Sequence, residues 1–254
     1  MMQDLHLVRM NIDSQALYRF ARRSRLPARD FDEGYAVHAL LAALFDSETN
    51  PDARVAPKPF RLVDPARRMI EVLGYASLDH RALGERAKSF ADPLAWDVCN
   101  VDEIASRPVP QFQVGSELGF SVRVCPVRRV AKRGNQQKER AEVDAFLAKV
   151  WEIDDPEVMV DRESVYLEWL RSEVQKDGAA LLRNAELTSF QLGRQHRRTQ
   201  GQDRRGARLS HPEACFEGSL EVRDPASFAA RLGRGLGRHR SFGFGMLLLK
   251  PARS

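Results

Sequence analysis

Apolar and polar residues alternate in LHLVRMNI, residues 5–12, as expected for a half-buried strand. In FDEGYAVHALLAALF, residues 31–45, the apolar positions recur at helical spacing, and acids stand at the start, where a helix N-terminus favours negative charge. Apolar, β-favouring runs at 59–63 and 69–77 are separated by DPARR and predict an antiparallel hairpin. The first quarter therefore predicts a strand, a basic linker, a helix and two strands.

The middle of the chain has a weaker pattern. Residues 78–112 show no clear period and contain three prolines, so no regular element is predicted there. LGFSVRVCPV, residues 118–127, predicts a strand that stops at Pro126. Helical patterns over 139–151 and 163–176 follow it.

The C-terminal part again alternates between strand and helix patterns. ACFEGSLEV, residues 214–222, predicts a strand, and DPASFAARL, residues 224–232, predicts a helix with Pro225 in its first turn. FGMLLL, residues 244–249, predicts a buried last strand. The end of the chain thus reads strand, helix, glycine-rich loop and strand.

This order of elements predicts an α+β fold of two tandem ferredoxin-like domains, each an antiparallel sheet with helices on one face. No internal repeat is visible in the sequence, so the prediction depends on element order alone. Domains of 100 to 150 residues are common, and a chain of 254 residues can hold two. We place the first domain, with the helix of 31–45, at 1–112 and the second at 113–254.

Composition excludes several classes of protein. Apolar residues make up 43% of the chain, but no run approaches the length of a membrane-spanning helix. The start, MMQDLHLVRMNIDS, lacks the basic flank of a signal peptide, so we expect a cytoplasmic protein without a membrane partner. The three cysteines and six histidines show no metal-ligand spacing, so we expect neither a metal nor another cofactor.

Charge is unevenly distributed along the chain, although 40 Lys and Arg against 35 Asp and Glu give a net charge of only +5. Guanidinium groups bind phosphates in pairs of hydrogen bonds and stack on bases, so arginine clusters favour a polyanionic partner. A solvated surface is the alternative. The candidate arginines outside the C-terminal loop are Arg22, Arg23, Arg25, Arg128, Arg129, Arg194, Arg197, Arg198, Arg204 and Arg205.

The segment from Arg231 to Gly245 combines five glycines with four arginines. A dinucleotide-binding loop would lie between a strand and a helix, whereas this loop follows a helix, and no GK[ST] of a P-loop occurs. Glycine amides can converge on phosphate oxygens, and a basic loop beside a sheet suits RNA, while tight packing alone is the alternative. The candidate residues are Gly233, Arg234, Gly235, Gly237, Arg238, His239, Arg240, Ser241, Gly243 and Gly245.

GRGLGRHRSFGFGMLLLKP, with ACFEGSLEV before it, resembles the C-terminal signature of CasE-type CRISPR repeat-processing endoribonucleases of the RAMP superfamily, which serve type I-E Cascade. VGSELGFSVRVCPVRR and VYLEWLRSEV resemble the family's mid-chain strand and the helix after it, and GYAVHALLAALF resembles its first-domain helix with Tyr-x-x-His. Residues 78–112 and 139–151 are poorly covered and look like insertions. Type IV effectors use processing enzymes of the same superfamily, so the type of system stays open.

The resemblance implies two tandem RRM-like domains that bind the stem-loop of a CRISPR repeat and cut the RNA at the base of the stem. It implies metal-independent cleavage in which the ribose 2′-hydroxyl attacks the phosphate, leaving a 2′,3′-cyclic phosphate and a 5′-hydroxyl. It also implies that the protein stays on the crRNA hairpin, together with other subunits of an effector complex.

The same resemblance makes His38 and Tyr35 the catalytic candidates. They are three residues apart on one predicted helix, so both rings can share a face. An imidazole titrates near neutral pH and can take or give the proton of an RNA hydroxyl, and a tyrosine can hydrogen-bond a phosphate. Arg240, where relatives often carry lysine, is expected to stabilise charge on the phosphate, and His239 is expected to contact RNA.

Two alternatives stay open. QLGRQHRRTQGQDRRGARL predicts a basic hairpin or disordered loop that contacts RNA, or else a mobile surface loop. As a second hypothesis, the chain could be a subunit that binds the crRNA hairpin without cleaving it, because the glycine loop and the arginines serve both functions equally. A nucleotide-dependent enzyme would require the glycine loop to bind free nucleotides, and the chain lacks the lysine and acid of such loops.

Overall fold

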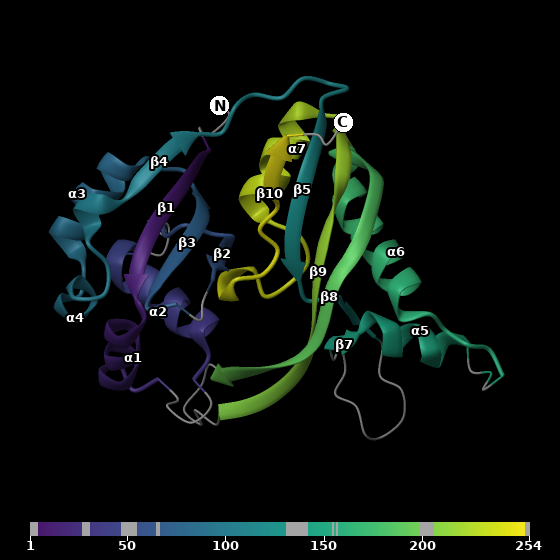
Figure 1. Ribbon diagram of the computed structural model, residues 1–254, viewed down its shortest axis with the longest axis horizontal. Helices are drawn as coiled ribbons and strands as arrows, with labels where there is room; N and C mark the ends of the chain where they lie inside the picture. Colours follow the sequence, from purple (N-terminus) through teal and green to yellow (C-terminus); the bar gives the residue numbers. More distant parts are fainter. Residues whose placement is uncertain are drawn as a thin grey trace.

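The computed structural model describes residues 5–26, 31–46, 55–64, 67–130, 142–153, 155, 157–198 and 206–251; for residues 194–198 and 206–210 it describes the backbone alone. Two four-stranded antiparallel sheets organise the chain (Figure 1). The outer sides carry α1, α3 and α4 on the first sheet and α6 on the second, and the segment after α7, drawn in yellow, lies between the sheets.

The first sheet has the strand order β2-β3-β1-β4. The predicted strand at 5–12 and the predicted hairpin are confirmed, because β3 pairs antiparallel with both β1 and β2. The buried face of β1 presents Val8, Met10 and Ile12, as its alternation predicts. The strands are β1 (His6–Asp13), β2 (Phe60–Val63), β3 (Met69–Ala76) and β4 (Ala105–Pro108).

Two expectations for the first half are wrong. The basic linker after β1 contains a helix, which buries Ala16, Leu17 and Phe20 while its arginines face outward. The weakly patterned residues 78–112 contain two helices and the edge strand β4, which pairs with β1. The helices of this half are α1 (Ser14–Arg23), α2 (Glu33–Phe45), α3 (His80–Phe90) and α4 (Pro93–Trp96).

The second sheet has the strand order β10-β5-β9-β8. The predicted strands at 118–127 and 214–222 fall on β5 and on the end of β9. Of the predicted basic segment at 191–209, residues 191–198 of β8 pair with residues 206–213 of β9, and residues 199–205 lie outside the described residues. The last strand is shorter than predicted and begins at Leu248. The strands are β5 (Glu117–Val124), β8 (Ala180–Arg198), β9 (Gly206–Val222) and β10 (Leu248–Pro251).

The helices of the second half agree with the sequence except at one place. The helix predicted over 139–151 begins only at Ala145, because residues 142–144 form a short strand paired with β6. Helices α6 and α7 confirm the patterns at 163–176 and 224–232, and α7 continues through Gly233. The elements are β6 (Val127–Arg129), β7 (Glu142–Asp144), α5 (Ala145–Ile153), α6 (Arg162–Gln175) and α7 (Pro225–Arg234).

The two sheets share one topology, which confirms the predicted pair of ferredoxin-like domains. When the four strands of each half are numbered in chain order, both sheets have the spatial order fourth, first, third, second. All neighbouring strands are antiparallel. Separate hydrophobic cores lie under the two sheets. The boundary after residue 112 stays a prediction, and it falls between β4 and β5.

The two halves contact each other through buried polar groups as well as apolar ones. The Tyr75 hydroxyl on β3 donates to the carbonyl oxygen of Leu247 at 2.9 Å. Arg61 Nη1 on β2 donates to Ser121 Oγ on β5 at 2.6 Å. Burial raises the pKa of the Tyr75 phenol well above its usual range, so this donor stays protonated. In the described part of the chain, none of the helices is long and apolar enough to cross a membrane.

Candidate active site and nucleic-acid interface

Helix α2 presents the two catalytic candidates at the junction of the halves. The side chain of Asp32 caps the helix by accepting a hydrogen bond from the backbone N–H of Tyr35 at 2.9 Å. Val37, Leu40 and Leu41 are buried in the first core, so that face of α2 faces inward. Tyr35 and His38 are only half-buried, as the predicted shared face requires.

Phe242 of the C-terminal loop contacts both candidate rings. Its ring stacks on Tyr35 with centroids 5.8 Å apart and meets His38 edge to face with centroids 5.2 Å apart. The approach is close because Gly34 lies against the backbone carbonyl of Phe242, where a side chain would not fit. The expected proximity of His38 to the glycine-rich loop is therefore observed, across more than 200 residues of sequence.

The glycines of the loop serve backbone packing in large part. Gly235, Gly237, Gly243 and Gly245 have φ between 66° and 85°, a region that glycine adopts at low cost. Gly237 also lies against the ring of Trp169, where an added Cβ would come within 2.7 Å. Gly233, by contrast, is part of helix α7.

Most of the loop amides that we expected to converge on phosphate already have protein partners. The N–H of Gly235 donates to the Arg231 carbonyl at 2.8 Å, that of Gly245 to the Arg123 carbonyl at 2.7 Å, and that of Gly237 to the Glu173 carboxylate at 3.0 Å. These three amides therefore have acceptors within the protein, as the alternative of tight packing expects, and contact of these glycines with RNA stays a prediction. Whether the loop contacts RNA through its side chains stays a prediction.

One carboxylate holds two basic residues of the loop. Glu142 on β7 accepts from Arg238 Nε at 2.6 Å and lies 3.0 Å from His239 Nε2 through its other oxygen. The His239 side chain is only 4% exposed, so its ring lies against the protein. It stacks at 5.9 Å on His211 of β9. Its predicted role as an RNA contact stays a prediction.

Arg123 on β5 is a further member of the site; the sequence places it in a basic cluster with Arg128 and Arg129, but it was not among the predicted site residues. Its guanidinium lies over the ring of Phe244 at 4.4 Å and donates to Glu213 at 2.6 Å, so it fixes the loop to the second sheet. Burial by itself raises the pKa of Glu213, but the neighbouring His211 and Arg123 lower it to about 2 overall. Two signals in the sequence point to Arg123: the basic cluster that contains it, and the alternation of SVRV, which places it opposite the buried valines.

Glu33 brings a carboxyl group close to the same region. It stands in the first turn of α2, and burial raises its pKa, an effect that Arg123 partly offsets and Asp32 reinforces. The guanidinium of Arg123 therefore faces carboxyl groups from both halves of the protein, one on α2 and one on β9.

The candidate RNA-binding arginines are spread over several elements. Arg22, Arg23 and Arg25 are exposed at the end of α1, Arg129 is exposed on β6, and Arg128 pairs with Glu152 at 3.8 Å. Arg234 at the end of α7 and Arg240 in the loop are exposed, and Arg240 Nη1 donates to the Arg234 carbonyl; Ser241 is half-buried. Arg194, Arg197 and Arg198 lie on β8 with only their backbone described, and Arg204 and Arg205 lie outside the described residues.

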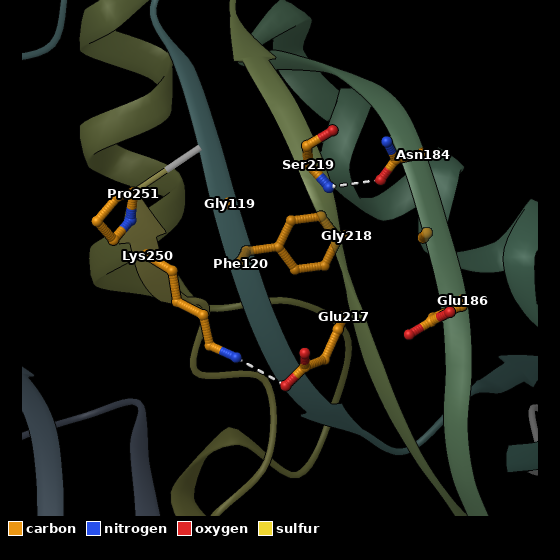
Figure 2. Close-up of a pocket in the computed structure, with 10 residues that line it drawn as sticks. Gly119, Phe120, Asn184, Glu186, Glu217, Gly218, Ser219, Lys250 and Pro251 are labelled. Atoms are coloured by element: carbon orange, nitrogen blue, oxygen red, sulfur yellow. Dashed lines mark hydrogen bonds and ion pairs between the residues drawn. The ribbon is translucent and has the colours of Figure 1, made fainter. Parts of the chain in front are cut away.

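Two hollows lie away from the catalytic candidates. The first, about 330 Å³, opens on the second sheet (Figure 2), where Lys250 Nζ binds Glu217 at 2.7 Å and Glu186 lies beside it. Its lining thus carries two carboxylates against one ammonium group, which does not favour phosphate. The second, about 490 Å³, includes Asp97, Asp102 and Glu103 in its lining.

The described residues include no group of three or more His, Cys, Asp or Glu placed to hold a metal ion.

Fold and site together define a class of protein in which two tandem ferredoxin-like domains bring a histidine and a tyrosine of one domain to a glycine- and arginine-rich loop of the other. The chain belongs to the family of CRISPR-associated proteins, since the family described as "CRISPR associated protein" matches residues 5–251. No curated protein sequence matches the chain at a significant level.

Solved structures share the fold at low sequence identity. Thermus thermophilus Cse3 bound to an RNA representing a pre-cleavage complex is 19% identical, with a TM-score of 0.60 over 98% of this chain and 100% of that chain. The CRISPR-associated protein Cas6e from Escherichia coli is 19% identical, with a TM-score of 0.53 over 97% and 100%. A chain of a CRISPR RNA-guided surveillance complex is 16% identical, with a TM-score of 0.58 over 97% and 100%. The predicted resemblance is confirmed for family and fold.

Proposed function

We propose that the chain is an endoribonuclease that cleaves precursor CRISPR RNA within its repeats and stays on the crRNA hairpin as a subunit of an effector complex. Membership of the CRISPR-associated family supports this function. Proteins of the same fold were solved with RNA and within a surveillance complex, which supports the same partners here. The single observation that carries the proposal is the contact of His38 with the loop residue Phe242.

The proposed reaction needs only groups of the RNA and of the chain. The ribose 2′-oxygen attacks the neighbouring phosphorus, the bond from phosphorus to the 5′-oxygen breaks, and a 2′,3′-cyclic phosphate and a 5′-hydroxyl result. The 2′-hydroxyl loses a proton and the leaving 5′-oxygen gains one, and the imidazole of His38 takes part in one of these transfers. Tyr35 hydrogen-bonds the phosphate, and the exposed Arg240 stabilises its developing charge.

RNA binding is proposed to use the exposed arginines at the junction, together with the candidate arginines Arg194, Arg197 and Arg198 on β8. The arginine cluster at the end of α1 precedes α2 in the chain, and α1 contacts α2 directly. These arginines can therefore hold phosphates beside the cut. The polar hollow of Figure 2 is not proposed as part of this path, because carboxylates outnumber cations there.

The decisive experiment incubates the purified chain with the repeat RNA of its own genome in EDTA and analyses the fragment ends. We expect one cut at the base of the stem, a cyclic phosphate and a 5′-hydroxyl. A shifted but uncut RNA would favour the alternative of a non-cleaving hairpin-binding subunit. Cleavage only after a divalent cation is restored would contradict the metal-independent mechanism.

A further inference from the structure

Phe242 occupies a central position among the rings at the junction. It ends the short 3₁₀ helix Arg240–Phe242, which packs on α2 and β2. Its ring contacts Tyr35 and His38 from the first half and His239, at 6.4 Å, from its own loop. A phenylalanine side chain has no group that can transfer a proton, so its part in proton transfer is to place the groups that do.

The turn that carries Phe242 is fixed to the second domain on both sides. Before it, Glu142 holds Arg238 and His239, and the Phe242 N–H donates to the His239 carbonyl at 2.8 Å. After it, the Gly245 N–H donates to the carbonyl of Arg123. The ring therefore has a defined place relative to the loop arginines proposed to bind RNA.

The same turn is fixed to the first domain. The carbonyl of Phe242 lies against Gly34 in the first turn of α2, one residue before Tyr35 and four before His38. Phe60 of β2 lies near Gly243, where an added Cβ would be 3.6 Å from its ring. Both catalytic candidates thus contact the ring of Phe242, a residue whose backbone is held by both halves of the protein.

We infer that Phe242 is a positioning residue: its ring sets the orientation of the His38 imidazole and the Tyr35 phenol relative to the RNA bound by the C-terminal loop. This inference rests on the proposed function. The orientation of an imidazole decides which nitrogen faces the reacting oxygen, and a misplacement of about 1 Å can cost roughly 100-fold in rate. An edge-to-face contact restricts the orientation of the His38 ring relative to Phe242.

The test uses Phe242→Leu, Phe242→Tyr and a matched control, Phe112→Leu. Phe112 meets Phe228 edge to face at 5.4 Å and 78°, nearly the geometry of Phe242 on His38, but within the second core. For each variant we would measure single-turnover cleavage at saturating protein, affinity for the repeat hairpin, and the NMR shifts of the His38 ring protons without RNA. If Phe242→Leu does not fold, Phe242→Met replaces it.

We expect Phe242→Leu to lower the cleavage rate constant by roughly 10- to 100-fold, to change hairpin affinity by less than about threefold, and to move the His38 proton shifts by removing the ring current. Phe242→Tyr should restore cleavage to within about threefold of wild type, and Phe112→Leu should leave the His38 shifts unchanged. Wild-type cleavage in Phe242→Leu, or no rescue by tyrosine, would overturn the positioning role alone. A wild-type protein that leaves the cognate RNA intact would instead overturn the proposed function, and the positioning role with it.

Discussion

Gly34 lies so close to the carbonyl oxygen of Phe242 that an added Cβ would come within 2.4 Å of it, so helix α2 of the first domain and the glycine-rich loop of the second touch without an intervening side chain. This contact brings the rings of Tyr35 and His38 onto Phe242. The relative placement of the two domains is therefore part of the candidate site. Substitutions at the contact should affect both stability and the site.

Gly34→Ala should destabilise the protein by about 1–3 kcal/mol, because the new methyl group collides with backbone that cannot move aside cheaply. The matched control is Gly84→Ala in α3, where an added Cβ would meet its nearest atom, the Val101 carbonyl oxygen, at 3.9 Å. Alanine is the better helix former, so the control should be neutral or gain up to about 1 kcal/mol. Urea unfolding of the two variants checks this, and equal stabilities would contradict the close approach.

His38→Ala should lower single-turnover cleavage of the repeat RNA by roughly 10²- to 10⁴-fold, because a proton-transfer group is lost. Affinity for the hairpin should change by only a few-fold, since we propose that arginines, and not His38, hold the phosphates. His80→Ala is the control, because His80 stands at the start of α3 and contacts Ser106. Cleavage by His38→Ala at the wild-type rate in EDTA would remove His38 from the mechanism.

Binding of the hairpin should weaken with salt, with a log-log slope of about −0.7 for each phosphate contact if single-strand values apply. Replacing the exposed Arg22, Arg23 and Arg25 by alanine should make this slope shallower by about 0.7 for each contact removed. Arg183→Ala is the control, because that guanidinium already pairs with Glu221. Fluorescence anisotropy titrations at several salt concentrations measure the slopes, and an unchanged slope in the triple variant would place the α1 cluster outside the interface.

The Glu213 carboxylate should make stability depend on acid pH. Its pKa is lowered from 4.5 to about 2 in the folded protein, so its contribution is complete above pH 4.5 and is lost as the pH falls towards 2. By linkage, the lowered pKa contributes about 3 kcal/mol to the free energy of unfolding, and Glu213→Gln should lack this contribution. The stability difference between wild type and variant should therefore shrink between pH 6 and pH 3.

Urea midpoints across that pH range, with Glu186→Gln as an exposed control on the neighbouring strand, measure the effect. A difference between wild type and Glu213→Gln that stays constant from pH 6 to pH 3 would refute the pairing of Glu213 with Arg123 and His211.

The elements that the sequence predicted well are those whose pattern is local. The alternation of apolar and polar residues in β1 and the helical spacing of apolar residues in α2 each extend over about a dozen residues. The sequence alone therefore shows which face of each element is buried. Helix α1 was missed because its exposed arginines look like a linker, although Ala16, Leu17 and Phe20 keep a helical spacing. The edge strand β4 was missed because only four residues pair, and their partner lies a hundred residues earlier.

For the site, the sequence alone determined the chemical groups: the Tyr-x-x-His pair on one helix, the arginine clusters, and the glycines that a tight loop needs. Only the tertiary structure decided which groups meet. The bonds from Glu142 to the loop, from Arg123 to Glu213 and from the loop amides to distant acceptors all join residues more than 60 positions apart. These contacts depend on how the strands, helices and loop of the second half pack together, and that packing depends on shape complementarity over the whole domain, which no local pattern of residues encodes.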